Sequence, residues 1–400
     1  MLDTMIITLF SVAVFLVIYH HAIYPALLKI VSKNKSIFNP TIAKRRYMFS
    51  AEDKELACFS IIIPAFNEAK FIAEKIRSIL AIDYPREKMQ LLVMSDGSTD
   101  QTIAVASKAL ENEFFMDVKI IDVKDRLGKT NIINKAMELA IGDYVVFSDA
   151  NVFLDKGIGR AINEAFTSDS VGGVAGQLTY LNEGVTGTSE NSGLYWRYEE
   201  FIKKHESLTG SMMGADGSIF AIRRALFRQL PLHVLDDFCT SMGVISQGYE
   251  LKFDENIKAY EKSVESSSEE YSRKVRISNR SFNSFKYLST EIFSGGLWNV
   301  FKFISHKLLR WFSFPLLMVV LVSSLCLSLN DRFYGGVLIA QLFCYAAAAI
   351  GSRFEFSGIV GKFTSVSYYF LMVNYAAFIG ISRSIKGEKV VVWKKAETAR

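Results

Sequence analysis

The chain has 400 residues and a mean hydropathy of +0.20, yet 22% of its residues are charged. Its long apolar runs are confined to the two ends, which indicates a soluble domain fused to membrane segments. The net charge of +5 comes mostly from basic residues beside those runs, so it gives no reason to expect a nucleic-acid partner. The four cysteines and five histidines have no metal-ligand or redox spacing, which indicates free thiols in a reducing compartment.

The first apolar run, residues 5–30, is long enough to cross a bilayer. A cleaved signal peptide is the alternative, but no basic residue precedes the run and no clear small-residue cleavage site follows it. We therefore expect residues 1–31 to form a transmembrane anchor. By the positive-inside rule, the basic residues near its end place the N-terminus outside and the following domain in the cytoplasm. These residues are Lys29, Lys33, Lys35, Lys44, Arg45 and Arg46.

Residues 55–281 are predicted to form an α/β domain, because short apolar runs alternate with helical segments. The expected strands are 59–64, 91–94, 118–123 and 144–147, and the expected helices are 70–81, 101–111 and 130–140. This alternation predicts a doubly wound, mostly parallel sheet. Further on the pattern is looser, as expected of a subdomain that binds an acceptor. There the sequence predicts a strand at 171–181 and helices at 194–206 and 235–248.

The C-terminal third is predicted to associate with a membrane. Residues 282–310 mix aromatic and basic side chains, which is typical of amphipathic helices in a membrane interface; a helix packed on the soluble domain is the alternative. Within 311–383, the segments 311–329, 333–350 and 363–381 are candidate transmembrane helices. Three crossings would put the C-terminus outside, whereas the basic tail, residues 384–400, favours the inside. The number of crossings therefore stays open.

Two strand ends in the soluble domain carry carboxylates. Asp96 ends the second strand, and Asp149 follows the strand at 144–147, with Asn151 two residues later. Ligands of an open α/β sheet bind beyond the carboxyl ends of its strands. The oxygens of Asp149 and Asn151 suit Mg²⁺ or Mn²⁺, which would also hold substrate phosphates. The alternative for each carboxylate is an Asp-containing turn.

Three further residues complete a reactive set. Lys129 stands at a strand-to-helix junction, where it could neutralise phosphate charge. Asp236 and Asp237 begin a predicted helix, and a carboxylate there could accept a proton from an attacking hydroxyl. The alternative is an acidic pair that only stabilises the helix N-terminus. Sugar transfer from a nucleotide diphosphate would use a nucleoside-binding carboxylate, a metal-binding carboxylate, a lysine and a base together.

Residues 59–280 resemble the catalytic domain of glycosyltransferase family 2, of the membrane-bound bacterial polysaccharide-synthesis kind. The resemblance implies an α/β nucleotide-diphospho-sugar transferase fold, called GT-A, with flanking membrane and interfacial helices. The segment 63–68 (Ile-Pro-Ala-Phe-Asn-Glu) resembles the family's opening motif, and 95–100 (Ser-Asp-Gly-Ser-Thr-Asp) resembles its second motif. The nucleotide-binding residues that these motifs and the segment 128–136 imply are Pro64, Ala65, Phe66, Glu68, Asp96 and Lys129.

Two of the remaining motifs depart from the family pattern. Residues 148–151 stand where the family has its Asp-x-Asp metal motif, with Asn151 in place of the second aspartate. Residues 214–217 resemble the glycine-rich acceptor-side segment, and 235–237 stand where processive members carry Thr-Glu-Asp. Asp237 is thereby implied to be the catalytic base, beside Asp236, with direct displacement and inversion.

Processive members also carry Gln-x-x-Arg-Trp, where this chain has Arg273-Lys274-Val275-Arg276-Ile277. Arg273 and Arg276 are the donor-binding candidates, but the glutamine and tryptophan are absent. We therefore expect the addition of one or a few sugars rather than processive synthesis.

The predicted function is metal-assisted, inverting sugar transfer at the cytoplasmic face of the inner membrane, by a multi-pass protein. The donor would be a nucleotide-diphosphate sugar, with uridine the commonest base among such relatives. The acceptor would be a lipid-linked or growing polysaccharide, and other polysaccharide-synthesis proteins are further candidate partners. The main alternative is a catalytically inactive, nucleotide-sugar-binding partner. A transporter is disfavoured because no paired membrane repeat is evident, and a nucleotidyltransferase because the first strand-to-helix turn lacks a Gly-rich basic signature.

Overall fold

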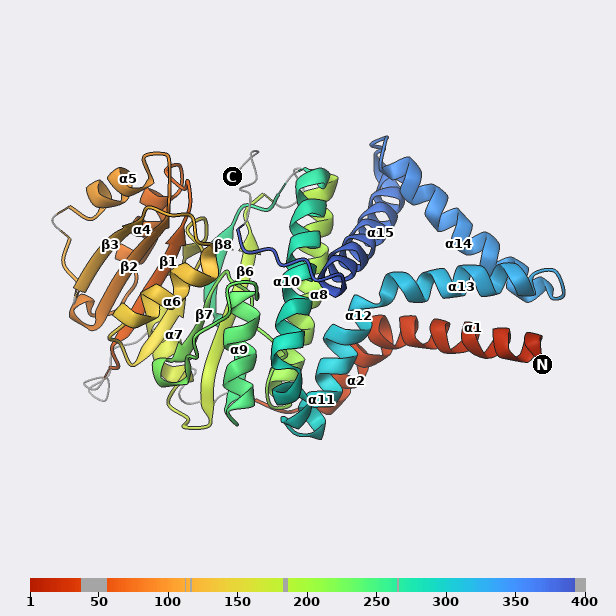
Figure 1. Cartoon of the computed structure of the whole chain (residues 1–400), viewed down its shortest axis with the longest axis horizontal. Coiled ribbons are helices and arrows are strands. Elements are labelled where there is room, and N and C mark those ends of the chain that lie inside the picture. Colours follow the sequence, from red (N-terminus) through yellow and green to blue (C-terminus); the bar gives the residue numbers. More distant parts are fainter. Residues whose placement is uncertain (37–55, 112, 116, 183–185, 265, 393–400) are drawn as a thin grey trace.

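The computed structural model describes residues 1–36 and 56–392, except 112, 116, 183–185 and 265. An α/β domain lies on one side of the molecule, and long helices extend from it on the other (Figure 1). The residues Lys44, Arg45 and Arg46, and those of the tail from 393 to 400, lie outside the described residues. The orientation that they predict therefore stays a prediction.

The described residues form a mixed eight-stranded sheet with the order β3-β2-β1-β4-β7-β6-β8-β5. Its first half is parallel: β3 (Asp117–Val123), β2 (Met89–Asp96), β1 (Phe59–Ala65) and β4 (Tyr144–Phe147). Its second half contains β7 (Phe220–Arg223), β6 (Val171–Tyr180), β8 (Glu250–Glu261) and β5 (Phe153–Leu154). There β7 pairs antiparallel with both β4 and β6, β6 is parallel to β8, and β5 pairs antiparallel with β8.

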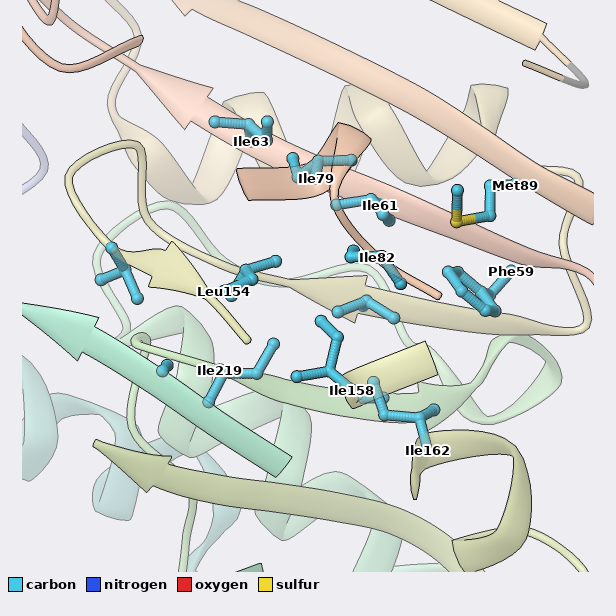
Figure 2. Packing of buried hydrophobic residues seen from close by; sticks show 14 of the residues in the cluster. Phe59, Ile61, Ile63, Ile79, Ile82, Met89, Leu154, Ile158, Ile162 and Ile219 are labelled. Carbon is cyan, nitrogen blue, oxygen red and sulfur yellow. The ribbon is translucent and has the colours of Figure 1, made fainter. Parts of the chain in front are cut away.

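Helices cover both faces of the sheet. Those that connect the strands are α4 (Ile72–Leu80), α5 (Thr102–Ala109), α6 (Lys129–Leu139), α7 (Ile158–Ala165), α8 (Gly187–Leu208) and α9 (Asp236–Ser246), and α10 (Ser267–Ser294) follows β8. Successive side chains of a strand point to opposite faces, so the apolar run of β1 supplies two separate cores. Phe59, Ile61 and Ile63 pack with Ile79 and Ile158 in the first core (Figure 2), whereas Ile62 belongs to the second.

The predicted strands and their order in the chain are confirmed for β1 to β4 and for β6, but β5, β7 and β8 were not predicted. The reason for missing β8 is clear from its side chains. Lys252 and Asp254 interrupt its apolar pattern, yet both are buried. Lys252 Nζ lies 3.0 Å from Gly210 O and 3.2 Å from a carboxylate oxygen of Glu250. Tertiary partners thus satisfy a charge that, in the sequence, is typical of a solvent-exposed segment.

The N-terminal helix is almost wholly apolar. It consists of α1 (Leu2–Ile18), a π-helical turn η1 (Tyr19–Ile23) and α2 (Tyr24–Val31). Together with α14 (Arg332–Gly351) and α15 (Gly358–Ile385), it is long and apolar enough to cross a membrane. Another candidate is α11 (Leu297–Phe303), η5 (Ile304–Leu308) and α12 (Leu309–Trp311) with α13 (Ser313–Leu327), a pair bent by 63°. Among the described residues, this gives three candidate spans, or four if the bent pair is one span.

Helix α10 runs without a break through position 281, where we expected the soluble domain to end. Phe282, Leu288 and Ile292 on its C-terminal half are buried in the second core of the domain. This part of the segment 282–310 therefore packs on the domain, as in the alternative interpretation of its amphipathic pattern. The helix ends at Gly295, and α11 then begins after Gly296, which has a positive φ of 87°.

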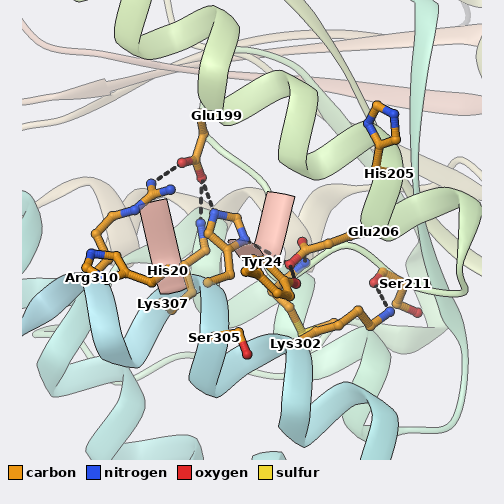
Figure 3. A network of polar contacts seen from close by, with 12 residues as sticks. His20, Tyr24, Glu199, His205, Glu206, Ser211, Lys302, Ser305, Lys307 and Arg310 are labelled. Atoms are coloured by element: carbon orange, nitrogen blue, oxygen red, sulfur yellow. Dashed lines mark hydrogen bonds and ion pairs between the residues drawn. The ribbon is translucent and has the colours of Figure 1, made fainter. Parts of the chain in front are cut away.

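A buried polar network joins the α/β domain to the apolar helices (Figure 3). Glu206 of α8 accepts a hydrogen bond of 2.6 Å from the Tyr24 hydroxyl. The His306 ring lies 3.0 Å from both Glu206 Oε1 and Glu199 Oε1, and Glu199 also pairs with Lys307 and Arg310. Removing one partner of such a network leaves a buried charge, which costs about 3–5 kcal/mol. The network therefore fixes α8 against the N-terminal anchor and the η5–α12 segment.

Two glycines, Gly176 in β6 and Gly243 in α9, provide a test of how the strands pair. A Cβ at Gly176, between β6 and β8, would lie 2.2 Å from the backbone oxygen of Ile257. We expect Gly176→Ala to lower stability by about 1–3 kcal/mol, because the two strands must separate. In α9, a Cβ at Gly243 meets no atom within 4 Å, so Gly243→Ala should leave stability unchanged or raise it by about 0.5–1 kcal/mol. Thermal unfolding of the full-length protein measures both, and equal midpoints would contradict the strand register.

Candidate active site

The two segments that follow β1 and β2 bind each other at the edge of the sheet. Asn67 has a left-handed φ of 54°, which turns the chain directly after β1. Its N–H donates to Ser98 Oγ at 3.1 Å, and its Oδ1 accepts from the Thr99 N–H at 2.8 Å. Beside this turn, the Arg126 guanidinium stacks on the Phe66 ring at 3.7 Å from its centroid. The turn thereby holds an aromatic ring and a cation at the mouth of the site.

Asp96 acts on a loop in this structure. Its buried carboxylate accepts hydrogen bonds from the N–H groups of Leu127, at 2.7 Å, and Gly128, at 3.0 Å. These bonds hold the loop that leads into α6, whose first residue is Lys129. Gly128 has a φ of 91°, which favours glycine at this turn. The contact of Asp96 with a nucleoside stays a prediction.

Lys129 joins carboxylates from two other elements. Its Nζ lies 2.8 Å from Asp149 Oδ1, just beyond β4, and 3.0 Å from Asp236 Oδ2, at the start of α9. A Cβ on Gly217 would lie 2.9 Å from Lys129 Nζ, 3.2 Å from Asp149 Oδ2 and 3.3 Å from Asp237 Oδ2. Three charged side chains thus surround one point, and a side chain at position 217 would have to displace the Lys129 ammonium.

The two aspartates at the start of α9 have opposite electrostatic environments. Burial and the neighbouring charge of Asp236 raise the pKa of Asp237 to about 7. Burial also acts to raise the pKa of Asp236, but Lys129 and Arg280 hold it below its ordinary value. One carboxylate of the pair therefore stays ionised while the other binds a proton near neutral pH. Such a division is typical of acid–base sites.

A divalent cation would fit at Asp149 if it kept further ligands from elsewhere. The Asp149 side chain is 38% exposed, and carboxylate oxygen suits Mg²⁺ or Mn²⁺. Asn151 is buried, and its Nδ2 donates to Glu261 Oε1 at 2.7 Å, so its amide is oriented by the end of β8. The described residues contain no group of three or more His, Cys, Asp or Glu side chains that could hold a metal. Phosphate oxygens and water would complete the coordination, as is usual for Mg²⁺.

Most of the predicted site residues line one cavity of about 980 Å³. They are Pro64, Phe66, Glu68, Lys129, Asp149, Asn151, Asp236, Asp237, Arg273 and Arg276. The predicted residues Ala65 and Asp96 are buried behind this lining. Asp216 of the glycine-rich segment also lines the cavity, where Lys203 Nζ lies 2.7 Å from its Oδ2. The structure thus brings together residues from strand ends and helices that are up to two hundred positions apart in the chain.

Arg280 is a site residue that sequence reasoning did not single out. Its Nη2 donates to Thr130 Oγ1 at 2.6 Å, and its Nε donates to Val234 O at 3.1 Å. The same Nη2 atom lies 3.8 Å from Asp236 Oδ1. Arg280 thereby connects α10 to the starts of α6 and α9. Its position, four residues after Arg276 on the same helix face, was the available signal.

A second feature that the sequence did not reveal is the segment 386–392 after α15, which returns to the domain (Figure 1). The Nδ2 atoms of Asn279 and Asn283 on α10 donate to Glu388 O at 3.2 and 3.3 Å. Further along, Val391 O would lie 2.6 Å from a Cβ on Gly128. The loop before Lys129 is therefore held between Asp96 on one side and this C-terminal segment on the other.

Comparisons with known proteins relate part of this chain to a family. Residues 60–230 match the family model described as Glycosyl transferase family 2. The chain is 25% identical over 209 residues to a poly-beta-1,6-N-acetyl-D-glucosamine synthase of Staphylococcus aureus (strain COL), covering 50% of this chain and 48% of that protein. A Staphylococcus epidermidis protein of the same name is 21% identical over 215 residues, with coverages of 52% and 51%. The chain thus spans about half the length of these curated relatives.

A solved structure resembles the chain over almost its whole length. This is the mannosyltransferase PcManGT from Pyrobaculum calidifontis, in complex with GDP-Man and Mn²⁺. Its TM-score is 0.66 at 18% identity, and the match covers 95% of this chain and 100% of that one. At this identity the likeness establishes the fold, and it confirms the predicted GT-A fold with flanking apolar helices.

Because the pKa of Asp237 is raised in the folded protein, the stability of the fold should depend on pH, and this can be measured without a substrate. In the folded protein this carboxyl keeps its proton up to about pH 7, whereas in the unfolded chain it loses the proton near pH 4. The folded state is therefore destabilised as pH rises between these values. We expect Asp237→Asn to raise the thermal midpoint, and to raise it more at pH 8 than at pH 5. A gain that is equal at both pH values would show that Asp237 titrates normally.

Proposed function

Residues 60–230 form a glycosyl transferase family 2 domain, and from this premise we propose that the chain is an inverting glycosyltransferase. It moves a sugar from a nucleotide-diphosphate sugar to a lipid-linked or growing polysaccharide acceptor at the cytoplasmic face of the membrane. A uridine nucleotide is the first donor to test. The observation that carries the proposal is the convergence of Lys129, Asp149, Asp236 and Asp237 at one end of a single cavity.

In this proposal the nucleotide binds along the carboxyl ends of β1 and β2. Phe66 and Glu68 line the cavity there and contact the base and ribose. Asp96 contributes by holding the loop before α6, and Lys129 neutralises charge on the diphosphate. The N-terminus of α6 adds a favourable dipole for the same anion. Arg273 and Arg276 line the far wall of the cavity, from which they would bind the donor.

Asp149 and Asn151 would hold the divalent cation, Mg²⁺ or Mn²⁺. When bound, this cation supplies Lewis-acid stabilisation of the departing diphosphate. Asp236 keeps Lys129 in place through their 3.0 Å ion pair, so the lysine stays directed toward the leaving group.

Asp237 is the catalytic base in this proposal. As the acceptor oxygen forms its bond to the anomeric carbon, the bond from that carbon to the diphosphate breaks, and the hydroxyl proton passes to Asp237. Because attack and departure occur on opposite faces of the sugar, the configuration inverts. A pKa of about 7 makes this carboxylate a stronger base than an ordinary aspartate, while leaving it substantially ionised near neutral pH.

Calorimetric binding of UDP, GDP and dTDP to the detergent-purified protein, with and without Mn²⁺, tests the donor site. We expect tight, metal-dependent binding of one diphosphate. Asp149→Ala should weaken this binding about tenfold or more, which is ~1.4 kcal/mol. Asp237→Ala should bind the diphosphate as wild type does and lower transfer by about 10²–10⁴-fold. Asp169→Ala, at an exposed position outside the cavity, is the matched control.

The outcomes of this titration separate the alternatives. Equal donor affinity in wild type and Asp149→Ala would show that the metal assignment is wrong. Donor binding without turnover across many nucleotide sugars would favour the inactive, nucleotide-sugar-binding partner. If no diphosphate binds to the wild type, the proposed function itself is wrong.

The pH dependence of transfer provides a further test of Asp237. Because the base must be ionised, the rate at saturating substrate should rise as pH passes through about 7 and level off above it. Replacing Asp237 with Glu should shift this midpoint, since the carboxyl then lies in a different environment. A rate that is independent of pH between 5 and 8 would rule out the assignment of Asp237 as the base.

A further inference from the structure

The cavity that contains the proposed catalytic residues continues to a candidate membrane helix. Its lining includes Pro64 and Asp149 of the proposed donor site and Phe370 of α15. It also includes Tyr195 of α8 and Lys274 of α10. One cavity of about 980 Å³ therefore connects the reaction centre to a helix that is long and apolar enough to cross a membrane.

The wall that α15 contributes contains an apolar stripe beside Tyr369 and Asn374. Val366, Phe370, Val373 and Ala377 all line the cavity, and their spacing of four, three and four residues puts them on one face of the helix. Val366 and Phe370 are 42% and 39% exposed. An accessible apolar stripe on a candidate membrane helix suits a hydrocarbon chain better than a sugar chain, whose hydroxyls would lose their hydrogen bonds to water there.

Next to this stripe, α10 and the η5–α12 segment bring cations to the cavity. They are Arg273, Lys274, Arg276, Lys307 and Arg310. Glu270, which pairs with Arg273 and Lys274, accepts a hydrogen bond from the Tyr369 hydroxyl, so these two cations lie beside α15. Cations at this place favour an anionic group at the boundary between the apolar stripe and the reaction centre.

Tyr195 organises two of these cations. Lys274 Nζ lies 4.3 Å from the centroid of its ring, and Arg310 Nη1 donates to its hydroxyl at 3.3 Å. Glu199 accepts from both Arg310 and Lys307, and these cations hold the pKa of Glu199 well below its ordinary value although burial acts to raise it. Glu199 therefore stays ionised beside two cations, and it does not cancel their combined charge (Figure 3).

We propose that the acceptor is an amphipathic lipid with a phosphate head group, bound with its hydrocarbon chain along the α15 stripe and its head group at Lys274 and Arg310. This proposal rests on the proposed function and specifies the acceptor. The group that receives the sugar then lies toward Asp237, within the same cavity. A water-soluble polysaccharide chain would leave the apolar stripe without a partner.

Binding of radiolabelled farnesyl phosphate to the full-length protein, in an uncharged detergent, tests the proposal. Wild type should bind the probe, and Lys274→Gln should bind it about tenfold more weakly because a charge-assisted contact is lost. Lys274→Arg, which keeps the charge, should bind as wild type does. The matched control is Lys362→Gln, because Lys362 is 66% exposed on α15 and does not line the cavity.

The apolar half of the site has its own pair of variants. Val373→Trp should fill the stripe and weaken binding about tenfold or more. Val360→Trp places the same ring on α15 outside the cavity, and binding should be unchanged. Thermal midpoints of all variants establish that they are folded. Farnesol and inorganic phosphate, tested as competitors at equal concentration, should each displace the probe far less than unlabelled farnesyl phosphate does.

Several results would overturn the proposal. Competition by inorganic phosphate as strong as that by farnesyl phosphate would indicate a simple anion site. Competition by farnesol as strong as that by farnesyl phosphate would show that the cations do not contribute to binding. Unchanged binding in both Lys274→Gln and Val373→Trp would place the lipid elsewhere. Nucleotide binding is measured in parallel: if a diphosphate binds and farnesyl phosphate does not, only the acceptor proposal fails, whereas loss of nucleotide binding in wild type contradicts the enzyme assignment.

Discussion

The ion pairs of Lys129 are the interaction on which the site depends. Its ammonium contacts Asp149 at the end of β4 and Asp236 at the start of α9, while its own helix begins at this residue. Three elements from different parts of the chain therefore meet at one partly buried cation. Burial acts to lower the pKa of Lys129, but Asp149 and Asp236 raise it above its usual value, so the lysine is charged at any ordinary pH. This fixed charge also lowers the pKa of Asp236, whereas burial and the charge of Asp236 raise the pKa of Asp237 to about 7.

Several elements hold the segments around this cation in place. Asp96 at the end of β2 binds the loop before α6, and Gly217 leaves the space that the charged groups share. Arg280 of α10 binds the backbone at Val234 and the hydroxyl of Thr130. Rigid second contacts of this kind keep catalytic groups within hydrogen-bonding distance of a substrate. The site is thus built from helices and strand ends, and its loops are tied to both.

Much of this could be predicted from the sequence because the decisive signals are local. Pro64 and Asp96 lie at the carboxyl ends of β1 and β2, and Asp149 comes shortly after β4; parallel strands bring such ends to one edge. The sequence could not indicate that Asp96 turns inward to bind a loop, because that contact depends on where residues 127 and 128 lie. Strand β8 was missed for a related reason: Lys252 within it is buried, and its ammonium donates to Gly210 O, a partner distant in the sequence.

The position of the apolar helices is also linked to the charged cluster, through α8 and α10. Glu199 and Glu206 of α8 bind groups of the N-terminal helix and of the η5–α12 segment. On α10, Asn279 and Asn283 bind the segment after α15, which then reaches Gly128 beside Lys129. A tilt of the apolar helices would therefore move both α8, which lines the cavity, and the loop that leads to the lysine. Because close-packed protein interiors deform little, the orientation of the apolar helices and the geometry of the charged cluster are set together.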